Sequence, residues 1–126
     1  MVKYVDSQGL EEILKTSSLP VFCDFWATWC APCRMLAPVF EEISDKYEGK
    51  AVFVKMDVDE ENSESAAIKY GITSIPNVIA FKNGEKVANG REKMRLFLKE
   101  NPAISKEIEE KIRAAAKGVD AEGKED

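Results

Sequence analysis

The sequence contains no histidine, and this absence excludes several kinds of chemistry at once. Without an imidazole there is no histidine general base, no Ser-His-Asp triad and no histidine ligand for a metal ion. Cysteine is also scarce, with three among 126 residues. Three is an odd number, and it is far too few for a small secreted domain held together by disulfides.

Long apolar runs and basic charge are scarce as well. No apolar run approaches the ~20 residues that cross a bilayer, and the acidic Asp6 follows the first few residues before a signal peptide could form. We therefore expect a cytoplasmic protein with no membrane partner. Of the net charge of −5, −3 falls on residues 118–126, so the rest of the chain offers no basic surface to nucleic acid.

The composition that is present, 44% hydrophobic and 33% charged residues, is typical of one globular domain. A long helix is expected to open at a pair of cysteines and to carry an apolar stripe as far as Tyr47. Asn62 and Gly71 are expected to cap a shorter helix at its start and end. Strands are predicted at residues 3–5, 21–27, 51–57, 77–81 and 86–88, and the other helices at 7–15, 62–70 and 91–100.

The order of these elements predicts an α/β fold. Early strands joined by helices must run parallel, whereas Asn83-Gly84 is a strong signal for an antiparallel hairpin. We therefore expect a central mixed β-sheet, with parallel strands plus a C-terminal antiparallel hairpin, flanked by helices on both faces. Residues 1–101 would form this domain.

A further segment follows a break at Asn101-Pro102. Residues 102–117 are predicted to add a C-terminal helix, with the helical residues at 103–117, and residues 118–126 to form a disordered acidic tail. The helix repeats isoleucine every four residues, and packing of these side chains on the same chain is the preferred interpretation, which makes the protein a monomer. The alternative is a dimer interface through Ile104, Ile108 and Ile112.

Cys30 and Cys33 form a C-x-x-C motif where a buried strand meets a helix. The first sulfur would lie at the helix amino end, where unpaired N–H groups and the helix dipole lower the pKa of a thiol. Arg34 stands where haem attachment needs histidine, and a zinc site would need two more ligands. The only other cysteine, Cys23, lies in an apolar strand and is interpreted as a small core residue rather than a regulatory thiol. A redox dithiol is therefore the favoured interpretation.

Three segments resemble the thioredoxin family and occur in its order. Residues 25–35 read FWATWCAPCRM, residues 70–76 read YGITSIP and residues 81–85 read FKNGE. The resemblance covers about residues 2–100 and implies a thioredoxin fold and a protein-disulfide reductase. In that reaction Cys30 attacks a disulfide of a protein substrate, and Cys33 then releases the substrate from the mixed disulfide. It implies no cofactor and no metal, and a thioredoxin reductase that recharges the dithiol.

The resemblance also implies roles for residues around the dithiol. Asp24 matches a buried carboxylate that accepts the Cys33 proton, because desolvation raises the pKa of a carboxyl. Lys55 matches a lysine that moderates this effect, with a solvated strand residue as the equal alternative. Pro76 matches a cis-proline that leaves the backbone of Ile75 free to pair with substrate. The expected substrate-binding residues are Trp29, Ala31, Pro32, Ser74, Ile75, Pro76 and Gly90.

Two other functions are left open by the motif. A protein disulfide oxidase or isomerase could use the same fold, although these often carry a histidine between the cysteines, and Ala31-Pro32 favours a reductant. A non-catalytic binding module with the same fold is the other alternative.

Overall fold

The computed structural model describes residues 1–89, 91–99 and 110–112. In the part of the chain so described, no helix is both long and apolar enough to cross a membrane. The elements in chain order are β1 (Lys3–Tyr4), α1 (Ser7–Thr16), β2 (Val21–Trp26), α2 (Ala31–Lys46), β3 (Val52–Asp57), the 3-10 helix η1 (Glu61–Ser63), α3 (Glu64–Lys69), β4 (Asn77–Lys82), β5 (Glu85–Asn89) and α4 (Arg91–Lys99).

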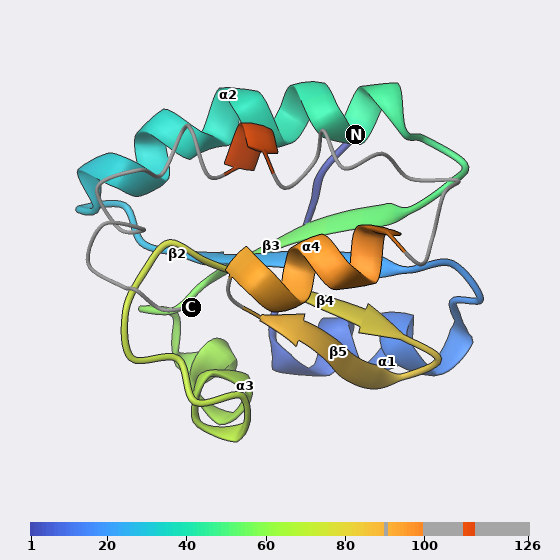
Figure 1. The fold of residues 1–126 in the computed structure, drawn as a ribbon. Coiled ribbons are helices and arrows are strands. Elements are labelled where there is room, and N and C mark those ends of the chain that lie inside the picture. Colours follow the sequence, from blue (N-terminus) through green and yellow to red (C-terminus); the bar gives the residue numbers. More distant parts are fainter. Residues whose placement is uncertain (90, 100–109, 113–126) are drawn as a thin grey trace.

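The five strands form one sheet in the order β1-β3-β2-β4-β5 (Figure 1). Strands β1 and β2 both pair with β3 in parallel, whereas β4 pairs antiparallel with β2 and with β5. The turn between β4 and β5 holds Asn83 and Gly84 at φ 54° and 82°, the left-handed region that an Asn-Gly hairpin turn requires. The predicted mixed sheet with a C-terminal hairpin is confirmed.

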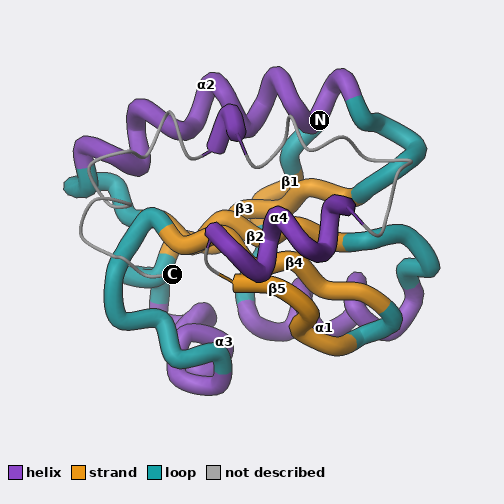
Figure 2. The backbone as a smooth tube through the Cα atoms, in the orientation of Figure 1, coloured by secondary structure: helices purple, strands orange, loops and turns teal. Residues whose placement is uncertain are grey.

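Helices cover both faces of the sheet, which appears as the middle layer between them (Figure 2). The alternation of side chains along β2 explains why both faces are apolar. Phe22 packs in a cluster with Phe40 of α2 and Phe97 of α4. Its neighbour on the opposite face, Phe25, packs in a second cluster with Leu10 of α1. Strand β2 is therefore buried on both sides, as its nearly continuous apolar sequence predicts.

The start of α3 differs from the prediction. Residues 61–63 form the 3-10 helix, so Asn62 lies inside a turn and does not cap the helix. Ser63 occupies the cap position of α3, but its side chain makes no capping hydrogen bond. The predicted end is confirmed, because Gly71 follows the helix at φ 64°.

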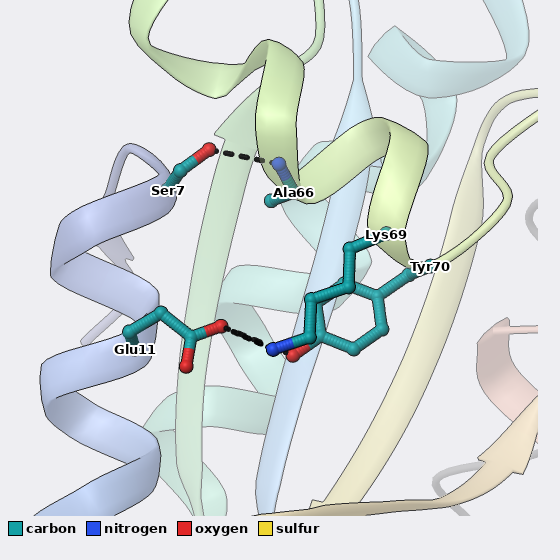
Figure 3. A network of polar contacts seen from close by, with 5 residues as sticks. All are labelled: Ser7, Glu11, Ala66, Lys69 and Tyr70. Carbon is teal, nitrogen blue, oxygen red and sulfur yellow. Dashed lines mark hydrogen bonds and ion pairs between the residues drawn. The ribbon is translucent and has the colours of Figure 1, made fainter.

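Helix α1 supplies the polar contacts that hold α3 in place (Figure 3). The hydroxyl oxygen of Ser7 accepts a hydrogen bond from the backbone N–H of Ala66 at 3.0 Å. One turn further along α1, the Glu11 carboxylate accepts from Lys69 Nζ at 3.2 Å and from the Tyr70 hydroxyl at 3.3 Å. A residue of another helix thus takes the place of a local cap, and α1 sets the position of α3 and of the loop that follows it.

Of the predicted C-terminal helix, the described residues 110–112 are helical and lie beside α2 (Figure 1). The side chain of Ile112 packs against the cluster between the sheet, α2 and α4. Lys111 Nζ lies 3.6 Å from a carboxylate oxygen of Glu42 on α2. Ile104, Ile108 and the acidic tail fall outside the described residues.

We predict that Ser7→Ala lowers the free energy of unfolding by about 1 kcal/mol, because a backbone N–H in the first turn of α3 loses its acceptor. Chemical denaturation measures the effect. Ser65→Ala, at an exposed serine in the first turn of α3, is the matched control and should change the free energy of unfolding by less than half as much. Equal effects of the two substitutions would contradict the capping role of Ser7.

Candidate active site

Cys30 and Cys33 form a disulfide at the amino end of α2, with their Cα atoms 5.2 Å apart. Cys30 occupies the cap position in an extended conformation, at φ −92° and ψ 108°, and its Sγ accepts a hydrogen bond from the backbone N–H of Cys33 at 3.2 Å. A sulfur in this position faces the unpaired N–H groups of the first turn. The sequence placed the pair at a strand-to-helix junction, and the structure has it there.

The loop between α3 and β4 lies directly beside the dithiol. The Ile75-Pro76 peptide bond is cis, and the carbonyl oxygen of Ile75 lies 3.8 Å from Cys30 Sγ. The half-buried Ile75 side chain packs against the small cluster that contains both cysteines. Segments 45 residues apart in the sequence thus meet at one reactive sulfur.

The other predicted substrate-binding residues differ in their exposure to solvent. Ala31 is exposed and Pro32 half-buried in the first turn of α2, while Ser74 is exposed and Pro76 buried in the loop. Gly90 lies outside the described residues.

Trp29, just before the disulfide, is 67% exposed yet held in place. Its indole Nε1 donates a hydrogen bond to the Asp59 carboxylate at 2.6 Å. Asp59 was not predicted as a site residue. The signal that could have found it is its position just after β3, because the carboxyl ends of the parallel strands β2 and β3 meet at one edge of the sheet.

Asp24 lies buried in the middle of β2, on the face that α2 covers, since it follows Phe22 by two residues. Among the described residues, neither carboxylate oxygen has a hydrogen-bond partner. Burial raises the pKa of the Asp24 carboxyl from 3.8 to about 7, and the positive charge of Lys55 lowers this pKa in part. A carboxyl in this state gains or loses its proton near neutral pH.

Lys55 lies opposite Asp24 in the register of β3 and β2 and is 6% exposed, so it is not a solvated strand residue. Its ammonium is placed against aromatic rings, 4.7 Å from the centre of the Trp26 ring and 5.6 Å from that of Tyr4. Trp26 therefore belongs to the surroundings of the site as well as to the core.

Cys23 lies on the opposite face of β2 from Asp24, fully buried in the cluster under α1 and α3. Burial raises the pKa of the Cys23 thiol, and the neighbouring Asp24 carboxylate raises it further. A buried and protonated thiol is unreactive, in agreement with the interpretation of Cys23 as a core residue.

Comparisons with known proteins agree with this geometry. The thioredoxin family model matches residues 1–100. A thioredoxin of Rickettsia bellii is 52% identical over 86 residues, which cover 68% of this chain and 80% of that protein. The chloroplastic M-type thioredoxin of Pisum sativum is 47% identical over 85 residues, and the match spans 68% of this chain and 48% of the pea protein. A solved structure of Plasmodium falciparum thioredoxin superimposes with a TM-score of 0.64 at 38% identity, covering 69% of this chain and 82% of that one.

We predict that Asp24 contributes a loss of stability as the pH rises from about 4 to about 7. Its pKa is higher in the folded protein than in the unfolded chain, so over this range the unfolded chain releases a proton that the folded protein keeps. Asp24→Asn removes this effect. The stability of the variant relative to the parent should increase between pH 4 and pH 8 by on the order of 4 kcal/mol.

Chemical denaturation across this pH range measures the difference. Glu60→Gln, at an exposed carboxyl, is the control and should follow the parent curve. If the free energies of unfolding of Asp24→Asn and of the parent changed in parallel with pH, the Asp24 carboxyl would ionise as easily in the folded protein as in water, which would contradict the prediction.

Proposed function

Because this chain belongs to the thioredoxin family and is a thiol–disulfide oxidoreductase, we propose that Cys30 is its attacking sulfur and Cys33 its resolving sulfur. As a protein-disulfide reductase it transfers two electrons from this dithiol to a disulfide of another protein. The observation that carries the assignment of roles is the hydrogen bond from the Cys33 N–H to Cys30 Sγ at the start of α2. The same N–H stabilises the Cys30 thiolate once the disulfide is reduced.

The reaction proceeds in two exchanges. The Cys30 thiolate attacks one sulfur of the substrate disulfide, so that a mixed disulfide forms, the substrate S–S bond breaks and the second substrate sulfur leaves as a thiolate. Cys33 then loses its proton and attacks Cys30 Sγ. The mixed disulfide breaks, the substrate leaves with both sulfurs reduced, and the Cys30–Cys33 disulfide remains.

Asp24 is the acceptor of the Cys33 proton in the second exchange. A general base works best with a pKa close to the working pH, and burial brings the pKa of the Asp24 carboxyl to about 7. It lies on the face of β2 against which α2 packs, under the helix that carries Cys33. The ammonium of Lys55 moderates the pKa of this carboxyl by its charge.

Substrate binds along the loop beside the dithiol. The Ile75 carbonyl, 3.8 Å from Cys30 Sγ, accepts a backbone N–H from an extended segment of the substrate. Backbone pairing of this kind does not depend on side chains, so many protein disulfides are acceptable substrates. Trp29, Ala31, Pro32 and Ser74 form the rest of the proposed contact surface, with the buried Pro76 beneath it, and the family resemblance adds Gly90 to the substrate-binding residues.

The reductase, the cellular compartment and the oligomeric state complete the proposed function. A thioredoxin reductase returns the disulfide to the dithiol, and the protein works in the cytoplasm as a monomer. Packing of Ile112 on the core of its own chain supports the monomer, because this side chain is then not available to a second copy. The dipeptide Ala31-Pro32 supports a reductant over an oxidase or isomerase, since it provides no histidine to stabilise the thiolate.

The parent protein is expected to accelerate the reduction of insulin disulfides by dithiothreitol, and Cys30→Ser should abolish this acceleration, because the attacking sulfur is gone. Cys33→Ser should also lose the acceleration. Mixed with insulin after the dithiothreitol has been removed, it should accumulate a covalent complex with the substrate, visible as a band on non-reducing gels. Cys23→Ala, at the buried cysteine on the other face, is the matched control and should retain turnover. Activity in Cys30→Ser would contradict the assignment.

Gel filtration tests whether the protein is a monomer. The full chain should elute at the volume of a single copy, and so should Ile112→Ala, whose free energy of unfolding should fall by about 1 kcal/mol because part of a core contact is lost. A dimer peak for the full chain that Ile112→Ala converts to a monomer would contradict packing within one chain.

A further inference from the structure

Three side chains form a row from the edge strand β1 to the central strand β2, on the face of the sheet that α2 covers. Tyr4 of β1 pairs in register with Lys55 of β3, and Lys55 pairs in register with Asp24 of β2. Residues paired in register on parallel strands point to the same face of a sheet. Tyr4 ends a strand of two residues and is 69% exposed, so its ring is not explained by burial in the core.

The ammonium of Lys55 lies against two aromatic rings and makes no hydrogen bond to the Asp24 carboxylate. Its Nζ is within 6 Å of both ring centres, 4.7 Å for Trp26 and 5.6 Å for Tyr4, the range in which a cation is attracted to the face of a ring. The two rings contact each other edge to face, with centres 6.1 Å apart and planes at 75°. Although Asp24 is the next residue in the row, neither of its oxygens receives a hydrogen bond among the described residues.

We propose that Tyr4 is a positioning residue, whose ring together with that of Trp26 holds the Lys55 ammonium off the Asp24 carboxylate, so that this carboxylate stays free to accept a proton. The inference rests on the proposed role of Asp24 as the acceptor of the Cys33 proton. A direct ion pair between Lys55 and Asp24 would favour the ionised carboxylate and make it a weaker base. The rings supply an alternative partner for the ammonium at the edge of the sheet.

Other charged groups near this row have partners of their own. Asp57, two residues along β3 on the same face, accepts a backbone N–H at 2.9 Å. On α2, Glu41 accepts a backbone N–H at 3.4 Å, and Asp45 lies 3.1 Å from the N-terminal amine. Glu48, just beyond the end of α2, lies 3.8 Å from the same amine. Cys33, also on α2, is in the disulfide. Asp24 is therefore the buried anion to which a released Lys55 ammonium would move.

The test is the titration of the Asp24 carboxyl in the oxidised full-length protein, followed by carbon-13 NMR. Tyr4→Leu should lower the pKa of this carboxyl by about one unit, because the ammonium moves onto it. Tyr4→Phe keeps the ring and should leave the titration where it is in the parent. Substitution of an exposed side chain on the edge strand leaves the core intact, which the amide spectrum of each variant verifies.

A second pair of variants separates this effect from the entry of water. In a Lys55→Met background there is no ammonium to release, so Tyr4→Leu should leave the Asp24 titration unchanged. A fall of the same size in that background would show that Tyr4 only excludes water, and would overturn the proposal. An unchanged or raised pKa of the Asp24 carboxyl in Tyr4→Leu alone would also overturn the proposal. Because the titration needs no turnover, these outcomes are independent of the insulin assay of the cysteine variants, which tests the proposed function.

Discussion

The pairing of β2 with β3 on one side and with β4 on the other determines where each reactive group lies. Because side chains alternate along a strand, a slip of one residue would turn Asp24 away from α2 and bring Cys23 to its place. Apolar clusters on both faces hold β2 in its register. The same strand ends just before the turn that carries Cys30 to the start of α2, so one register places both the sulfurs and the carboxyl.

The buried carboxyl of Asp24 opposes the stability of the fold that holds it. Taking a carboxyl out of water without a hydrogen bond favours its neutral form, which is why its pKa is raised to about 7. The large apolar core around β2 offsets this cost. A direct ion pair with the neighbouring Lys55 would reduce the cost, lower the pKa of the carboxyl and so make it a weaker base in the proposed reaction. In the structure the Lys55 ammonium lies against aromatic rings instead.

The parts of the fold that depend on neighbouring residues could be predicted, and those that depend on distant ones could not. Asn83-Gly84 marked the hairpin, because its left-handed turn is a property of two adjacent residues. The start of α3 was predicted wrongly, because its polar contact comes from Ser7, 59 residues earlier. In the site, the cysteine motif and the family resemblance identified the dithiol and Asp24. Asp59 was missed, because its position just after β3 places it at the correct edge of the sheet but does not identify Trp29 as its partner.

By itself, the sequence determined the order of the strands and helices and the identity of the reacting sulfurs. Hydrophobic periodicity and the chemistry of a helix start are local, so they can be read from adjacent residues. Only the tertiary structure decided that the Ile75 carbonyl faces Cys30, that Asp59 holds Trp29, and that the Lys55 ammonium lies against aromatic rings. These contacts join residues 29 or more positions apart, and the packing of the sheet and helices brings them together.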